Sequence, residues 1–102
     1  MFLAKVIGHV VATKKDDKMK GRKLLILRPQ LVDPEDPTKF RDGSNTVVAV
    51  DGLGAGKGEM VLFVQGSSAR ATEGMKPLPV DCAVVGIVDT VDVLGKQTYK
   101  AK

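Results

Sequence analysis

A hydrophobic period of two residues at the start of the chain limits the possible folds more than any other feature. Between Phe2 and Ala12 every even position holds an apolar residue or glycine, whereas the odd positions include Lys5 and His9. Successive side chains of a β-strand point to opposite faces, so this pattern predicts a strand with one apolar face. Gly8 in the middle of the strand indicates a bulge or tight bend, of the kind that curls a sheet into a barrel.

The remaining strands are predicted from apolar runs that end at turn-forming residues. They cover residues 23–28, 46–51, 60–65 and 82–93. Pro29 closes the first of these runs, because proline cannot donate a ladder hydrogen bond. Residues 29–45 are so rich in proline, aspartate and other turn formers that we expect a long exposed loop there. Residues 95–102 begin with a turn at Gly95 and are expected to form a short basic tail.

A short helix is predicted before the last strand. Ser67 or Ser68 can accept a hydrogen bond from the free amides of a first helical turn, and Pro77 and Pro79 limit the helix to roughly two turns. Five strands and one short helix predict an all-β fold, a small OB-like five-stranded antiparallel β-barrel. A chain of 102 residues has room for one such domain, spanning residues 1–102.

Composition excludes several classes of protein. No segment approaches the ~20 uninterrupted apolar residues that a membrane span needs, and Lys5 and His9 interrupt the apolar N-terminal run that would otherwise suggest a signal peptide. We therefore expect a soluble protein that keeps its N-terminus. Cys82 is the only cysteine, so an internal disulfide is impossible and a reducing cytoplasm fits. Its apolar neighbours predict a small buried side chain.

Two of the predicted strands are apolar on both faces, namely 60–65 and 82–93. An antiparallel sheet in so small a protein normally leaves one face in water, so something else must cover the second face. Self-association is the simplest answer, and a closed ring built from one repeated heterologous contact is a standard solution. We expect the apolar second faces, including Val61, Phe63 and Val85, to be divided between the barrel core and a neighbouring subunit.

The sequence offers no convincing catalytic, cofactor or metal site. Residues 51–58 (DGLGAGKG) look like a phosphate loop, but Asp51 and Gly58 stand where a Walker A loop needs glycine and a hydroxyl residue. A structural glycine turn is the better interpretation. A nucleophilic Ser68 would need a base nearby. The only histidine is His9 on an early strand, and nothing in the sequence places it near Ser68. One cysteine and one histidine give no zinc-ligand spacing.

A second hypothesis is an OB-like module that binds single-stranded nucleic acid. The formal net charge is +4, from 16 lysine and arginine residues against 12 acidic residues, and basic residues cluster between positions 14 and 23. Asp16 and Asp17 lie among them, so a solvated turn explains the cluster. The four aromatic residues are too few and too dispersed for a base-stacking platform. We therefore expect no nucleic-acid partner, no membrane and no small-molecule substrate.

Three segments together carry a resemblance to a known family. They are residues 51–62 (DGLGAGKGEMVL), 66–70 (GSSAR) and 79–89 (PVDCAVVGIVD), and residues 5–8 (KVIG) also fit. In this order and spacing they closely resemble the EutN/CcmL family of bacterial microcompartment shell proteins. The resemblance implies a cyclic homopentamer of OB-like barrels at the fivefold vertices of a shell in the cytoplasm. It also implies hexameric and trimeric shell proteins as partners and no enzymatic activity.

Residue roles follow as hypotheses from this implied ring. Ser67 and Ser68 are predicted to lie near the axial opening, because small residues suit a place where five copies converge. Arg70 is the candidate for a charged subunit contact, with Asp89 or Glu59 as its partner, because arginine forms forked hydrogen bonds to carboxylates. Gly54 and Gly56 of the glycine turn are also expected at the interface between subunits.

Overall fold

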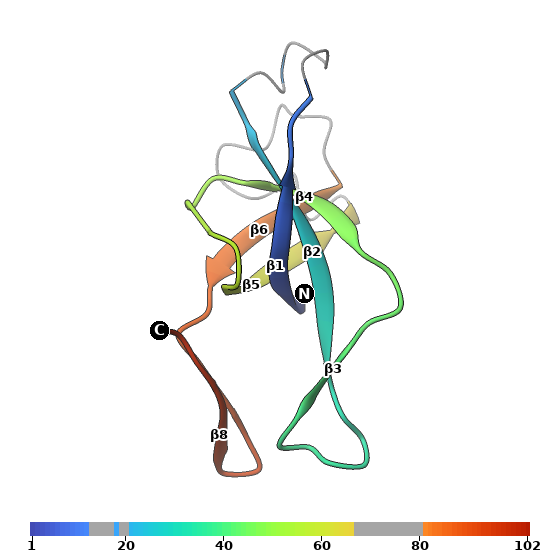
Figure 1. Ribbon diagram of the computed structural model, residues 1–102, viewed down its shortest axis with the longest axis vertical. Helices are drawn as coiled ribbons and strands as arrows, with labels where there is room; N and C mark the ends of the chain where they lie inside the picture. The colour runs from blue at the N-terminus through green and yellow to red at the C-terminus, as the bar shows by residue number, and fades with distance from the viewer. Residues whose placement is uncertain (13–17, 19–20, 67–80) are drawn as a thin grey trace.

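The computed structural model describes residues 1–12, 18, 21–66 and 81–102. These residues form an all-β structure, as the sequence predicts (Figure 1). In chain order its strands are β1 (Phe2–Val10), β2 (Lys23–Val32), β3 (Phe40–Asp42), β4 (Val47–Asp51), β5 (Met60–Gln65), β6 (Cys82–Ile87), β7 (Thr90–Val93) and β8 (Lys96–Lys100). The predicted short helix at Ser67–Thr72 lies outside the described residues. The described part contains no helix of the length and apolarity that crossing a membrane requires.

Five of the strands close into a barrel. They follow the order β1-β5-β6-β4-β2, and a further pairing of β1 with β2 completes the circle. Four of the five contacts are antiparallel. The predicted five-stranded barrel is thus confirmed, and its one parallel contact, between β4 and β6, runs through Val50 and Ala83. Strand direction cannot alternate around a ring with an odd number of members, and one parallel neighbour pair is therefore unavoidable.

The bulge that Gly8 predicts is present. The register between β1 and β2 shifts between Val6, which pairs with Leu27, and Gly8, which pairs with Ile26. Ile7 is the extra residue, and its side chain is 40% exposed. Bulges increase the local twist of a strand, so this one lets β1 bend and pair with β2 on one side and β5 on the other.

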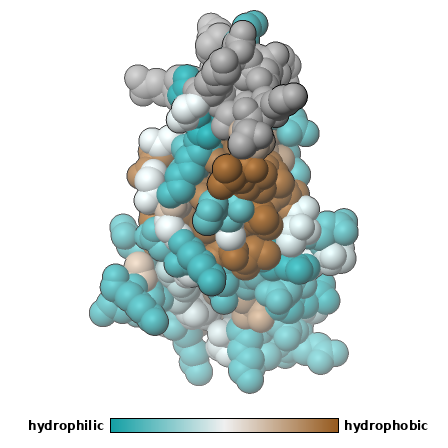
Figure 2. Space-filling view, turned by 45° about the horizontal axis from the view of Figure 1, so that its top comes forward, coloured by the Kyte–Doolittle hydropathy of each residue, from teal (hydrophilic) through white to brown (hydrophobic). Residues whose placement is uncertain are grey.

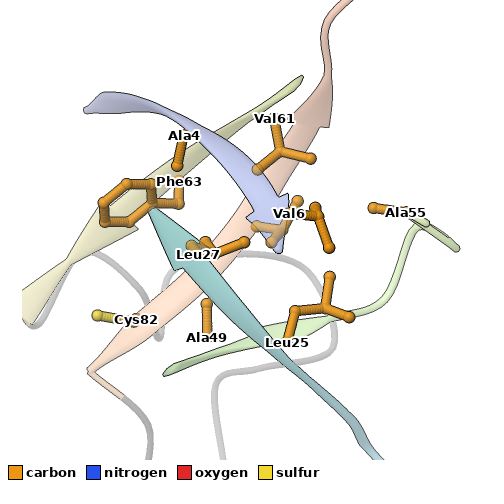
Figure 3. Packing of buried hydrophobic residues seen from close by; sticks show 10 residues of the cluster. Ala4, Val6, Leu25, Leu27, Ala49, Ala55, Val61, Phe63 and Cys82 are labelled. Atoms are coloured by element: carbon orange, nitrogen blue, oxygen red, sulfur yellow. The ribbon is translucent and has the colours of Figure 1, made fainter. Parts of the chain in front are cut away.

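The core lies inside this barrel and is built mostly from small and branched side chains (Figure 3). Phe63 is the largest of the fully buried residues, and the ring of Phe2 packs against it with 5.3 Å between ring centroids. Val61 and Phe63 thus belong to the core of one subunit, whereas Val85 is half-buried. The cluster comprises Ala4, Val6, Leu25, Leu27, Ala49, Ala55, Val61, Phe63, Cys82 and Val84.

The segment predicted as an exposed loop, residues 29–45, is instead largely a hairpin. Strand β2 continues through Pro29 to Val32 and pairs with β3, with Gln30 opposite Asp42. The strand tolerates proline here because only its amide is missing: the Pro29 carbonyl still accepts a hydrogen bond from the Gly43 amide at 2.7 Å. Gln30 is buried and donates from Nε2 to Asp42 Oδ1 at 2.8 Å, which ties the two strands together.

The C-terminal part also differs from the prediction. The long strand expected over 82–93 is divided into β6 and β7, and the expected tail 95–102 contains β8, which forms a second hairpin with β7. Sequence reasoning missed this hairpin because Lys96, Gln97 and Lys100 are polar. Its strands pair only with each other. Both hairpins project from the same end of the barrel, on different sides of it (Figure 1).

Candidate functional site

The glycine turn between β4 and β5 is organised by a buried carboxylate. Asp51, the last residue of β4, is 5% exposed. Its Oδ1 accepts a hydrogen bond from the Leu53 amide at 2.8 Å, and its Oδ2 accepts one from the Ala55 amide at 2.7 Å. One aspartate thus satisfies two backbone amides of the turn, because an ionised carboxylate has two acceptor oxygens.

Further contacts hold the turn against the barrel. Glu59 Oε1 accepts from the Gly56 amide at 2.5 Å, and Lys23 Nζ donates to the Ala55 carbonyl at 2.7 Å. Ala55 is completely buried in the core cluster. Gly54 has a φ of 83° and Gly58 one of 88°, in the left-handed region that favours glycine.

This arrangement disfavours the phosphate-loop interpretation. A phosphate loop presents free backbone amides to an anion. Here three amides of the turn already donate to Asp51 and Glu59, and those two carboxylates would repel a phosphate. The glycines therefore serve the conformation of the turn, which leaves Leu53 and Gly54 exposed on the outer surface.

The predicted site residues are only partly within the described structure. Ser67, Ser68 and Arg70 lie outside the described residues. Glu59 is half-buried and already bonded to its own turn, whereas Asp89 is exposed and only its backbone carbonyl is engaged, by the Ala101 amide at 2.8 Å. Of the two proposed partners for Arg70, Asp89 has the side chain that is available to a second subunit.

One hollow lies beside the glycine turn, and another lies beside the β2–β3 hairpin. The first, of about 480 Å³, is lined by residues 57–59 and 99–102, which include Lys57, Lys100 and Lys102. Tyr99 lies at this hollow, and its hydroxyl accepts a hydrogen bond from the Met60 amide at 3.2 Å, which attaches β8 to β5. The second hollow, of about 300 Å³, is lined mainly by apolar residues. Sequence reasoning missed both, because each joins segments that are far apart in the chain.

Large apolar side chains remain exposed on the outside of the barrel. Val48 of β4 is 49% exposed, and the bulge residue Ile7 and the turn residue Leu53 are also exposed. Figure 2 shows hydrophobic side chains gathered over the middle of one face, with mostly hydrophilic side chains below them. Exposed apolar surface gathered in one place is typical of interaction sites, protein–protein interfaces among them.

Two of the described titratable groups, Cys82 and Asp36, have shifted pKa values. His9 is exposed, and within residues 1–12, 18, 21–66 and 81–102 no group of three or more metal-ligating side chains is close enough to hold an ion. Burial raises the pKa of the Cys82 thiol, although a hydrogen bond from Gln65 opposes the shift. The Thr38 hydroxyl and amide donate to Asp36 and lower the pKa of its carboxyl.

Fold and surface together define a class of protein. It is a small OB-like barrel whose glycine turn is closed by its own hydrogen bonds and whose outer surface exposes apolar side chains, features suited to assembly. The sequence profile of the family described as "Ethanolamine utilisation protein EutN/carboxysome" matches residues 1–89. The chain belongs to this EutN/CcmL family, as the three segments indicate.

Curated relatives align with this chain over nearly their whole length. It is 48% identical over 94 residues to the bacterial microcompartment shell vertex protein GrpN of Rhodospirillum rubrum, an alignment that covers 92% of this chain and 99% of GrpN. It is 47% identical over 91 residues to the shell vertex protein PduN of Salmonella typhimurium, which covers 89% of this chain and 98% of PduN.

Solved structures agree with the sequence matches. The pentameric microcompartment shell protein GrpN from Rhodospirillum rubrum superposes with a TM-score of 0.78 at 41% identity, over 92% of this chain and all of GrpN. CcmL of Nostoc sp. PCC 7120 superposes with a TM-score of 0.84 at 42% identity, over 99% of this chain and all of CcmL. The closed barrel is thus the fold of the family.

Proposed function

We propose that five copies of this chain form a ring that occupies the vertices of a bacterial microcompartment shell. The observation that carries this proposal is the match to GrpN, a pentameric shell vertex protein, at 41% identity over its whole length. Relatives that are this similar over a whole single domain share the surfaces by which the domain assembles. The apolar side chains of Ile7, Val48 and Leu53 are exposed and therefore available for a contact between subunits.

A vertex protein meets a geometric need. Hexagonal tiles alone cover a flat surface, and closing an icosahedral shell requires fivefold positions where curvature is introduced. A ring of five barrels joined by one repeated heterologous contact supplies that symmetry. Its neighbours in the shell are the hexameric and trimeric shell proteins, and its role is structural, with no substrate and no catalysis.

Contacts within the ring are assigned to the GSSAR segment and the glycine turn. Ser67 and Ser68 line the axial opening, and Arg70 pairs with Asp89 of the adjacent subunit. Support for Asp89 over Glu59 comes from its exposed side chain, since Glu59 Oε1 already accepts from Gly56. Gly54, exposed on the turn, and Gly56 behind it lie at the same interface.

Native mass spectrometry of the purified chain tests the ring directly. The expected result is a dominant species of five chains that persists on dilution. The Arg70→Ala variant should dissociate at higher concentrations than the wild type, because it loses a charged contact at each interface. Lys5→Ala is the control for loss of one positive charge, since Lys5 is exposed on β1. A monomeric or dimeric wild type would overturn the proposed function.

Co-expression with a hexameric shell protein tests the vertex role itself. The expected result is closed particles when the chain is present and open sheets or tubes when it is absent. Closed particles that form equally well without the chain would show that it does not cap vertices.

A further inference from the structure

The tip of the β7–β8 hairpin holds an apolar residue in an unfavourable conformation. Val93 pairs with Lys96, so Leu94 and Gly95 form a two-residue loop, and their φ angles are 51° and 79°. Positive φ at both positions defines a type I′ turn, whose first position favours asparagine, aspartate or glycine. Leu94 is the only residue other than glycine with a positive φ in the part of the chain described here. A branched side chain there carries a conformational cost that the turn itself does not require.

The same leucine gains nothing within its own subunit. Its side chain is 83% exposed, more than any other large hydrophobic residue described. The hairpin that carries it forms a separate two-stranded sheet, and the Met60–Tyr99 hydrogen bond links it to barrel strand β5. A free two-stranded hairpin is only marginally stable in water. Both observations point to a surface outside the subunit that receives the tip.

A matching recess exists at the foot of the other projecting hairpin. The hollow of about 300 Å³ is lined by Phe2, Leu31, Val47 and Phe63, together with smaller and polar residues. None of its described lining residues is ionisable. Phe2 is 46% and Leu31 42% exposed, so the recess lies open to solvent in the single chain. Its volume accommodates one leucine side chain.

The charges of the two hairpins are also complementary. Residues 30–43, beside the recess, carry four carboxylates and two basic residues, whereas residues 90–102 carry three lysines and one aspartate. Opposite net charges on two surfaces favour one docking partner and one orientation. The hairpins stand on different sides of the barrel (Figure 1), an arrangement that lets the hairpin tip and the recess meet different neighbours in a ring.

We propose that Leu94 of one subunit inserts into the recess of the next subunit. This inference rests on the proposed function, because it requires a ring of identical chains. Because Leu94 (the knob) and the recess are different surfaces of one chain, their contact is heterologous, and such a contact can close into a ring when it is repeated. Five knobs then fill five recesses, whereas docking of Leu94 on a shell tile would leave every recess empty.

Disulfide trapping tests the contact. In the L94C/S44C double variant, mild oxidation should join adjacent subunits and give a ladder of two to five chains on a non-reducing gel, because Ser44 lines the recess. Each single variant is a control and should give no ladder beyond two chains. Buried Cys82 is present in all of them and should not contribute.

Dilution experiments provide an independent measurement. L94N suits the type I′ turn, so the subunit should stay folded by circular dichroism while the dissociation constant of the ring rises at least about tenfold, the loss expected for one buried leucine. L94M keeps an apolar knob and should stay within about threefold of the wild type. Leu31→Asp in the recess should weaken the ring, and the L94N/Leu31→Asp pair should be non-additive.

The outcomes separate this inference from the proposed function. A wild-type pentamer that shows no ladder in L94C/S44C, with L94N as resistant to dilution as the wild type, would overturn the inserted knob and leave the vertex role intact. An L94N ring that is intact but fails to close shells would place Leu94 on a tile and would overturn the proposal as well.

Discussion

Replacing Asp51 with alanine should destabilise the subunit more than any other single loss of charge among the described residues. The carboxylate is buried and accepts hydrogen bonds from two amides of the glycine turn, at 2.8 Å from Leu53 and 2.7 Å from Ala55. Removing it leaves both donors without their acceptor. A buried donor that loses its partner costs its full desolvation penalty, which exceeds the net worth of the bond.

The magnitude follows from the burial of each amide. The hydrogen bond to Ala55 is buried, so its loss should cost about 2 kcal/mol. The hydrogen bond to Leu53 is partly buried and water can replace it, so about 1 kcal/mol is expected. Asp51→Ala should therefore lower the free energy of unfolding by about 3 kcal/mol. Asp51→Asn keeps one acceptor oxygen and should lower it by about half as much.

Urea denaturation at one fixed subunit concentration measures these differences, because assembly also contributes to apparent stability. Glu35→Ala is the matched control: it removes the same charge from an exposed side chain at the tip of the β2–β3 hairpin and should change stability by less than about 0.5 kcal/mol. If Asp51→Ala unfolds within about 0.5 kcal/mol of the wild type, the carboxylate does not organise the turn, and the reasoning is refuted.

Two further predictions concern the C-terminal hairpin and the thiol. Tyr99→Phe removes the acceptor of the Met60 amide, so the free energy of unfolding should fall by about 1 kcal/mol. Exchange of the Met60 amide hydrogen should also accelerate. Unchanged exchange would contradict a role for the hydroxyl. Burial raises the pKa of the Cys82 thiol and blocks access to it, so a thiol reagent at pH 8 should label the native protein at least about tenfold more slowly than the urea-unfolded chain. Equal labelling rates would show that the thiol is accessible in the folded subunit.

Much of the barrel was predictable from local patterns. The two-residue period of 2–12 located β1, and Gly8 located its bulge, because both depend on one strand's alternation and backbone freedom. The glycines at 52–58 located a turn between two strands for the same reason. The family resemblance rested on motifs in 51–89, which the match over residues 1–89 confirms.

Polar elements were harder to predict. Strand β8 (Lys96–Lys100) has no apolar face, and Pro29 appeared to end β2 although the strand runs on to Val32. In both cases pairing with a partner strand decided the structure, and a partner's position is not a local property. Roles for Ser67, Ser68 and Arg70 stay predictions, because these residues lie outside the described structure.

The sequence by itself determined the fold class, the positions of most strands and membership in the EutN/CcmL family, because hydrophobic alternation, turn residues and motif spacing are recorded along the chain. Only the tertiary structure decided the parallel β4–β6 contact, the hydrogen bonds that Asp51 accepts from the amides of its own turn, the exposure of Leu94, and the presence of an apolar recess beside the β2–β3 hairpin. The parallel contact and the recess join residues that are distant in sequence, whereas the roles of Asp51 and Leu94 depend on the backbone conformation of their turns. Neither property can be read from the order of amino acids alone.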